Sequence, residues 1–101
     1  MSLMLHTIQK EKKRIDYMLA SYQKQLDELP KGSVVSKVAG KNVYYYLKYR
    51  DGKKVHTDYL GKDGEKVDAI RASLEKRRHV ETMISNLRAE QAIANKVLEG
   101  K

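Results

Sequence analysis

The sequence predicts an α+β fold in which two long helices flank a three-stranded antiparallel β-sheet, in the order α-β-β-β-α. Apolar residues recur at helical spacing through residues 4–29 and again through residues 64–98. Between them, residues 33–60 are rich in β-branched and aromatic residues and contain two glycine turns. We therefore expect a long, coiled-coil-like antiparallel helical hairpin with a β-meander inserted between its helices.

The first helix is predicted over residues 4–29. A seven-residue apolar repeat, typical of coiled coils, runs along it at Ile8, Ile15, Tyr22 and Leu29. Pro30 ends the helix, because proline disfavours helical geometry in the residue before it and has no N–H to donate. Residues 1–3 precede a second methionine and are interpreted as a leader added for expression, so that residues 4–101 form a single elongated domain.

Three strands are predicted at about residues 33–39, 42–49 and 53–60, joined as a meander. Gly40-Lys41 is expected to form a two-residue turn, which places Val34, Ser36 and Val38 on the apolar face of the sheet. For the second hairpin we predict a three-residue loop at residues 50–52. This loop pairs Leu47 with Val55 and Tyr45 with Thr57, and it turns the apolar rows of both strands to one side. In this register Lys54, His56 and Asp58 face outward together with Lys48.

The second helix is predicted over residues 64–98, with Asp63 as its N-cap. Folding back on the first helix, its apolar stripe brings Leu26 to Ile70, Ile15 to Val80 and Ile8 to Leu87, and leaves the end beyond residue 92 without a partner. A single seam between two helices buries little apolar surface against the entropy of ordering the chain. We therefore expect a homodimer in which a four-helix bundle buries a second apolar edge, formed by Leu5, Leu19, Met83 and Val97.

Composition and charge narrow the classes of function. Charged residues make up 34% of the 101 residues and the net charge is +8, of which residues 31–62 supply +6. A concentrated field of one sign favours a polyanionic partner. The chain has no cysteine and no apolar run long enough to cross a membrane, so we expect a cytoplasmic protein without a membrane partner.

The candidate site is the basic, tyrosine-bearing face of the sheet. Lys and Arg bind phosphate, and Tyr stacks on unpaired bases. The predicted nucleic-acid-binding residues are Lys37, Tyr44, Tyr46, Lys48, Arg50, Lys53 and Lys54. The alternative is a protein-interaction or oligomerisation module, because tyrosine also favours strands and lysine also protects exposed sheet edges.

No catalytic motif is present, so we expect a protein that is not an enzyme and that uses no cofactor. His56 and Asp58 lie two residues apart on a predicted strand. A metal site would need further ligands, and neither a cysteine nor a second histidine is close in sequence.

The stretch YYYLKYRDGKKVHTDYLGK resembles a group of small uncharacterised prokaryotic proteins that carry a domain of unknown function. The shared pattern lies within about residues 31–80, and its matching residues are Gly32-Ser33-Val34, Tyr44 to Leu47, Tyr49-Arg50, Gly52, Lys54-Val55 and Tyr59-Leu60-Gly61. This resemblance implies no activity. The hairpin is also similar to the N-terminal hairpin of some insertion-sequence transposases.

Overall fold

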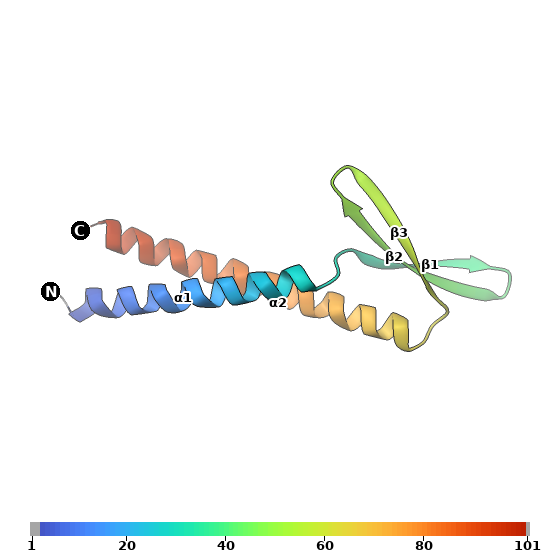
Figure 1. The fold of residues 1–101 in the computed structure, drawn as a ribbon, viewed down its shortest axis with the longest axis horizontal. Helices are drawn as coiled ribbons and strands as arrows, with labels where there is room; N and C mark the ends of the chain where they lie inside the picture. Colours follow the sequence, from blue (N-terminus) through green and yellow to red (C-terminus); the bar gives the residue numbers. More distant parts are fainter. Residues whose placement is uncertain (1–2, 101) are drawn as a thin grey trace. The chain divides into compact units, whose positions relative to one another are not determined.

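The computed structural model describes residues 3–100 and confirms the predicted order of elements (Figure 1). Of the predicted leader, residues 1 and 2 lie outside the described residues, and α1 begins at the third. The elements are α1 (Leu3–Glu28), β1 (Ser33–Ala39), β2 (Asn42–Asp51), β3 (Lys54–Gly61) and α2 (Glu65–Glu99).

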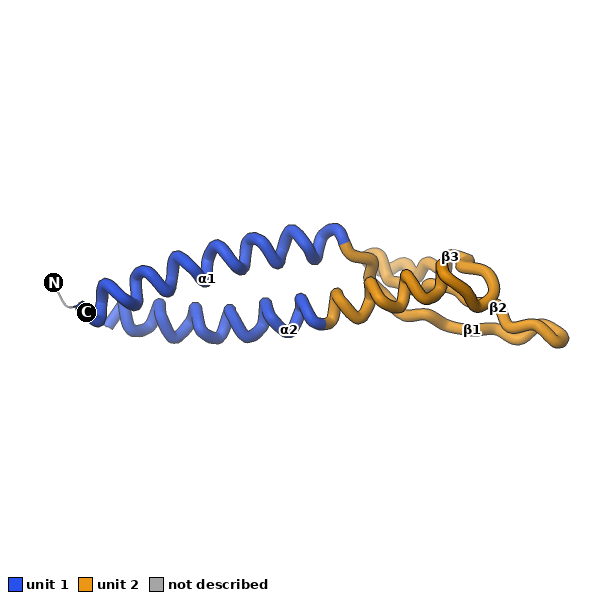
Figure 2. Tube along the Cα trace, turned by 90° about the horizontal axis from the view of Figure 1, so that it is seen from below, with its two compact units in different colours: residues 1–28, 79–101 blue, residues 29–78 orange. Residues whose placement is uncertain are grey.

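The chain divides into two compact units, which are coloured separately in Figure 2. The helical unit combines α1 with the part of α2 from His79 onward, and the sheet unit runs from Leu29 to Arg78. The second helix is continuous over 35 residues and contributes to both units.

The sheet has the order β1-β2-β3, so β2 is the central strand and the two turns lie at its opposite ends (Figure 1). The predicted register of the first hairpin is confirmed, because Val34 pairs with Leu47 and Ser36 pairs with Tyr45 around the Gly40-Lys41 turn. Gly40 has a φ of 64°, and every positive φ among the described residues belongs to a glycine. Glycine at the first turn position with a positive φ is typical of a type II′ turn, which suits the twist of a hairpin.

The predicted register of the second hairpin is wrong. Asp51 pairs with Lys54, so the turn is the two-residue Gly52-Lys53, again with glycine first and a φ of 62°. Leu47 therefore lies opposite Asp58 and not Val55. Because side chains alternate along a strand, this places Val55, Thr57 and Tyr59 on the face predicted for Lys54, His56 and Asp58.

The pairing of β2 with β3 shifts by one residue between Tyr45 and Tyr46, close to the end of β3. Tyr46 pairs with Tyr59 but Tyr45 pairs with Gly61, so β3 has one extra residue, Leu60, at this point. Such a β-bulge changes the direction of the side chain next to it. Leu60 is buried while Tyr59, its neighbour, is 56% exposed. Leu60 therefore continues the core-facing row of β3, and the bulge lies where this row reaches the core.

The core of the sheet unit lies between one face of the sheet and the first half of α2. Leu47 and Leu60 from the strands pack with Val67 and Leu74 from α2. Half-buried apolar residues surround this group: Val34, Tyr45, Tyr49 and Ile70. Since a sheet of this size must cover one face to be stable, the first turns of α2 are occupied by the sheet.

This packing explains why the predicted pairing of the two helices is wrong. Ile70 packs against the sheet and not against Leu26, which instead lines a shallow hollow together with Ile84. Asp16 accepts a hydrogen bond of 2.8 Å from Gln91, where the predicted pairing would place it near Val80. The observed partner of α1 thus lies about three turns further along α2. The end of α2 beyond residue 92 is paired as well, since Leu98 lines a hollow with Gln9.

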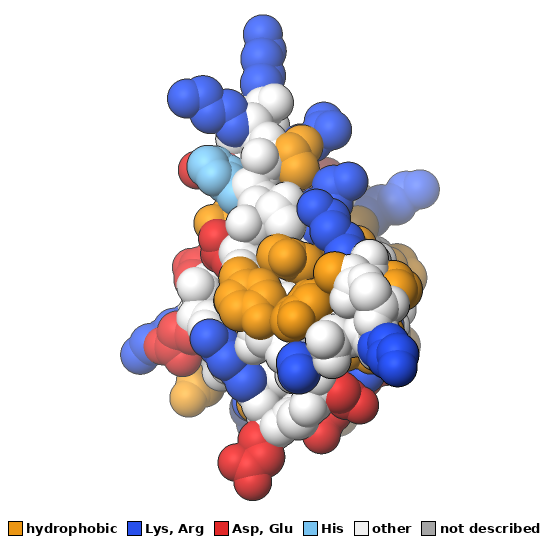
Figure 3. All heavy atoms as spheres, turned by 90° about the vertical axis from the view of Figure 1, so that its right-hand side faces the viewer, with side chains coloured by type: hydrophobic (Ala, Val, Ile, Leu, Met, Phe, Trp, Pro, Cys, Tyr) orange, Lys and Arg blue, Asp and Glu red, His pale blue; other side chains and the backbone are white. Residues whose placement is uncertain are grey.

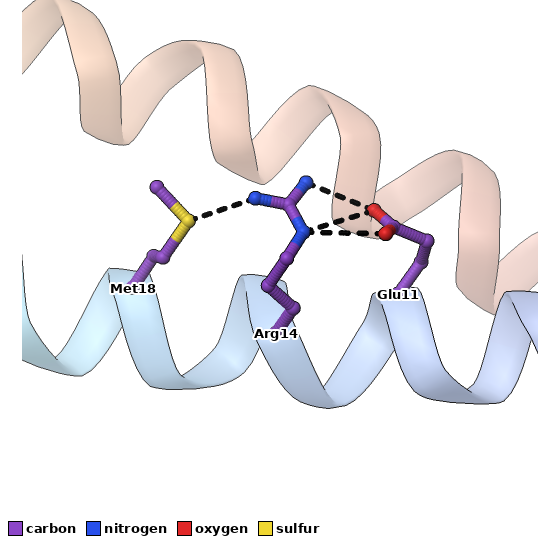
Figure 4. Close-up of polar contacts among 3 residues, drawn as sticks. All are labelled: Glu11, Arg14 and Met18. Atoms are coloured by element: carbon purple, nitrogen blue, oxygen red, sulfur yellow. Dashed lines mark hydrogen bonds and ion pairs between the residues drawn. The ribbon is translucent and has the colours of Figure 1, made fainter.

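In the helical unit, α1 lies beside the second part of α2, and α1 begins at the end where α2 finishes (Figures 1 and 2). The buried residues are Ile15 from α1 and Val80, Ile84, Leu87 and Ala94 from α2. Residues 11–14 form a polar turn of α1 between the apolar Ile8 and Ile15, and side chains of this turn contact neighbours on the same helix (Figure 4). There Arg14 contacts the carboxylate of Glu11 at 2.9 Å and the sulfur of Met18 at 3.0 Å. The Arg14 hydrogen bond lowers the pKa of Glu11.

The connections between elements depend on glycine and on backbone capping. Gly32, just before β1, has a φ of 112°, and a Cβ at this position would overlap the carbonyl oxygen of Lys48. At the start of α2 the carbonyl of Gly64 accepts the first helical hydrogen bond from the amide of Asp68 at 3.0 Å. The N-cap is therefore Gly64, one residue after the predicted Asp63.

Candidate nucleic-acid interface

The face of the sheet opposite to the core is the candidate interface, and we refer to it as the outward face. Residues that are paired across neighbouring strands point to the same face, so the pairing gives the members of this face. They are Val35 and Lys37 in β1, Tyr44, Tyr46, Lys48 and Arg50 in β2, and Val55, Thr57 and Tyr59 in β3. Tyr44, Tyr46 and Lys48 do not turn inward, and this placement is the one on which the prediction of a binding surface depends.

Charge is divided unevenly between the two faces of the sheet. The outward face carries the three cations Lys37, Lys48 and Arg50. Among the residues of the three strands, no Asp or Glu lies on this face. Both acidic residues of the sheet, Asp51 and Asp58, have the opposite orientation. The corrected register therefore removes Asp58 from the candidate interface, where the sequence had placed it, and makes the outward face more positive than predicted.

The same correction moves Lys54 and His56 away from the outward face. Lys54 lies opposite Asp51, and His56 lies opposite Tyr49 with the two rings stacked at 5.2 Å. Lys53 occupies the second position of the turn and belongs to neither face. Of the seven predicted residues, the structure brings five together on the outward face: Lys37, Tyr44, Tyr46, Lys48 and Arg50.

Three tyrosines form a cluster in the middle of the outward face. The ring of Tyr59 lies 5.3 Å from that of Tyr46 and 6.2 Å from that of Tyr44, and it is tilted against both. The Nζ of Lys37 lies 5.0 Å above the ring of Tyr46, and that of Lys62 lies 5.9 Å from the centre of Tyr44. Tilted aromatic pairs and cations over aromatic faces are favourable arrangements, so these contacts hold the cluster in place.

Tyr59 and Lys62 were not predicted as members of the site. The signal that identifies Tyr59 is the repetition of Gly-Lys at both turns. Applying the two-residue turn of Gly40-Lys41 to Gly52-Lys53 gives the observed register, and that register brings Tyr59 to the outward face.

On the opposite face, Tyr49 lies in a more acidic environment. Partial burial raises the pKa of the Tyr49 hydroxyl, and the carboxylate of Asp58, to which the hydroxyl donates a hydrogen bond, raises it further, with a smaller contribution from Asp51. Both carboxylates thus act on the core side of the sheet and leave the outward cations unneutralised.

Cations also extend from the turns. Lys41 and Lys53 follow the turn glycines and are exposed. Figure 3 looks toward the hairpins and shows Lys and Arg side chains at the end of a hairpin, and both basic and acidic side chains beside a group of apolar ones. The tyrosine cluster, with Lys37 and Lys62 against its rings, is chemically suited to a ligand that combines flat rings with negative charge.

The structure also bears on a metal site and on a membrane span. No group of three or more His, Cys, Asp or Glu side chains that could hold a metal ion occurs in residues 3–100. Over the same range, neither helix combines the length and the apolar character that crossing a membrane requires.

Comparison with known proteins identifies a family but no activity. No curated protein and no solved structure is significantly similar to the chain. Residues 4–69, which include α1, the whole sheet and the start of α2, match a family described as a domain of unknown function, DUF6788. This match covers well over half of the sequence, and the chain therefore belongs to the DUF6788 family.

Proposed function

We propose that the protein is a non-enzymatic nucleic-acid-binding module that uses the outward face of its sheet. The observation that carries the proposal is the gathering of Lys37, Lys48 and Arg50 around an aromatic cluster, on a face from which the acidic residues are excluded. Lysine and arginine side chains bind phosphate oxygens, and exposed aromatic rings bind bases.

A salt titration separates this function from a purely structural role of the lysines. With about four phosphate contacts, from the three outward cations and Lys53, affinity should fall about two decades between 50 and 200 mM salt. The measurement is fluorescence anisotropy of labelled single-stranded and duplex oligonucleotides, DNA and RNA, titrated with the full chain at both salt concentrations.

The two faces of the sheet supply a matched pair of variants. Lys48→Glu and Lys54→Glu make the same change in net charge at exposed positions of neighbouring strands, but on opposite faces. We expect Lys48→Glu to lower affinity at least about tenfold, and Lys54→Glu to have a clearly smaller effect. Equal losses for both variants would show attraction by net charge alone and would remove the outward face from the mechanism.

A second candidate function, self-association through the helices, is favoured by a separate observation. The helix α1 is 26 residues long, and Ile15 is its one buried residue. Along the predicted second apolar edge, Leu5, Leu19 and Met83 are half-buried and Val97 is 43% exposed. Pairing of two copies would bury this edge, and each fully buried large apolar side chain contributes about 1.5–3 kcal/mol.

Sedimentation velocity tests the homodimer. We expect a dimer at micromolar concentration and at least about a tenfold weaker association for Val97→Glu. Ala92→Glu places the same charge on another side of α2 and serves as the control. A stable monomer of the unmodified chain at micromolar concentration would contradict the proposal.

A further inference from the structure

We infer that the ligand of the outward face is single-stranded nucleic acid and that Tyr59 is the residue on which an unpaired base stacks. The inference rests on the proposed function and names its ligand class and its central contact. It also changes the assignment made from the sequence, in which Tyr44 and Tyr46 were the stacking residues.

The first argument is the exposure of the three rings. Tyr59 is 56% exposed, whereas Tyr44 and Tyr46 are half-buried. Lysine side chains lie over the rings of Tyr44 and Tyr46, and an incoming base would have to displace them. Tyr59 is thus the most accessible of the three aromatic surfaces.

The second argument is that Tyr59 is held before any ligand arrives. Its ring is tilted at 56° to Tyr46 and at 46° to Tyr44, so two neighbouring rings restrict its rotation. A side chain that is already ordered loses less conformational entropy on binding. Tyr44 and Tyr46 therefore act as positioning residues for Tyr59.

The third argument concerns the width of the sheet. Tyr46 pairs with Val35 on one side and with Tyr59 on the other, so Tyr46 and Tyr59 lie where the sheet is three strands wide. The major groove of DNA admits a helix or a two-stranded ribbon. The bases of a duplex are also stacked on one another and offer edges, not faces. An exposed aromatic ring on this sheet, such as that of Tyr59, therefore fits an unpaired base.

The cations at the two sides of the cluster suit such a strand. Lys37 lies beside Tyr46 and Lys62 lies beside Tyr44, both with Nζ within 6 Å of a ring centre. With a base on Tyr59, both flexible lysines can leave the rings for the phosphates on either side of that nucleotide. The ribose does not enter this contact, so the geometry accepts DNA and RNA alike.

The test uses the full chain and four labelled 12-nucleotide probes at 50 mM salt: oligo-dT, oligo-U, a DNA duplex and an abasic DNA strand that keeps the phosphates. We expect both single strands to bind at least about tenfold more tightly than the duplex and the abasic strand. Tyr59→Leu should weaken binding of oligo-dT about tenfold and leave the abasic strand unaffected, while Tyr59→Phe should retain tight binding.

Tyr17→Leu is the matched control, because Tyr17 is 69% exposed and lies on α1, outside the sheet unit. Circular dichroism verifies that every variant retains the fold. If Tyr59→Leu binds oligo-dT as well as the unmodified chain does while Lys48→Glu binds it weakly, the inference is overturned and the proposed function stands. Binding of the duplex as tightly as oligo-dT would likewise overturn the inference and leave the proposed function standing. If the unmodified chain binds none of the probes, both fail.

Discussion

The guanidinium group of Arg77 in α2 donates a hydrogen bond of 3.1 Å to the carbonyl oxygen of Leu29, 48 residues earlier in the chain. Leu29 follows the last residue of α1 and precedes Pro30, where no further helical turn can satisfy its carbonyl group. Because the bond is partly buried, an unsatisfied carbonyl here would carry a desolvation cost. Arg77 thereby fixes the connection that leads into β1 against α2.

Replacing Arg77 should destabilise the sheet unit. For Arg77→Met we expect a loss of about 1–3 kcal/mol in the free energy of unfolding, since the apolar part of the side chain is kept and the donor is lost. Urea denaturation followed by circular dichroism measures it. Lys76→Met, at the exposed neighbouring position, should stay within about 0.5 kcal/mol. Equal effects at both positions would mean that the hydrogen bond contributes nothing.

Alanine substitutions at two glycines with positive φ distinguish the free-energy cost of backbone strain from that of steric overlap. Around Gly40 a Cβ would meet no atom within 4 Å, so Gly40→Ala should cost only the backbone strain, about 1–2 kcal/mol. At Gly32 a Cβ would also overlap the backbone of Lys48, so Gly32→Ala should cost at least about 3 kcal/mol. Thermal denaturation of both variants compares them, and a Gly32→Ala variant as stable as Gly40→Ala would show that β1 does not start as closely against β2.

The observed register of β2 and β3 can be tested with engineered disulfides, since the chain has no cysteine of its own. Lys48 lies opposite Thr57, at the spacing of a pair that two cysteines can bridge. The register predicted from the sequence would place Lys48 opposite Lys54 instead. After mild oxidation, mass spectrometry should show an intramolecular disulfide in the Lys48→Cys/Thr57→Cys variant and free thiols in Lys48→Cys/Lys54→Cys; the reverse result would restore the three-residue loop.

The raised pKa of Tyr49 predicts how stability changes at alkaline pH. A proton is held more tightly by folded than by unfolded Tyr49, so its contribution is complete below the unfolded pKa of about 10 and is lost as pH rises through the folded value. The free energy of unfolding of the unmodified chain should therefore fall more steeply above pH 10 than that of Tyr49→Phe. Urea denaturation at pH 8 and at pH 10.5 provides the comparison, and parallel slopes would show that Asp58 and partial burial do not perturb the hydroxyl.

Asn95 contributes an uncompensated polar atom to the helical unit. Its Oδ1 is buried and accepts no hydrogen bond from residues 3–100. Asn95→Leu should raise the free energy of unfolding by about 1 kcal/mol, because it replaces a buried unsatisfied oxygen with an apolar group of similar size. Asn86→Leu, exposed on the same helix, is the control and should change little. Destabilisation by Asn95→Leu would show that the oxygen has a partner in solution.

The sequence predicted the elements well because their signals are local. Pro30 and Gly32 mark the end of α1, and glycine turns separate the strands, so all five elements were located within one or two residues. These signals act through the conformations open to single residues and do not depend on the rest of the fold.

The relations between elements were harder to predict because several solutions satisfy the same pattern. An apolar stripe with a seven-residue repeat matches a partner stripe at several offsets, so the sequence did not distinguish Val80 from Gln91 as the neighbour of Asp16. The sheet decides the offset between the two helices, because its apolar face packs against Val67, Ile70 and Leu74 of α2.

The candidate site was predicted in part for a similar reason. Lys37, Tyr44 and Tyr46 follow from the first hairpin, whose register was correct. The contribution of β3 depended on treating Val55, Thr57 and Tyr59 as its apolar row, whereas the core uses a single side chain from this strand, Leu60. By simple alternation Leu60 lies on the same face as Lys54, His56 and Asp58. The core-facing row of β3 is therefore mostly polar, and choosing the more apolar row selected the wrong face.

The dependence of β3 on a single core side chain also makes this small sheet adaptable. Anchoring of the strand depends on Leu60, and the three side chains before it on the outward face make no contribution to the buried core. Positions 55, 57 and 59 can therefore be exchanged without repacking the interior, so new ligand preferences could be selected there, in nature or by design, on an unchanged scaffold.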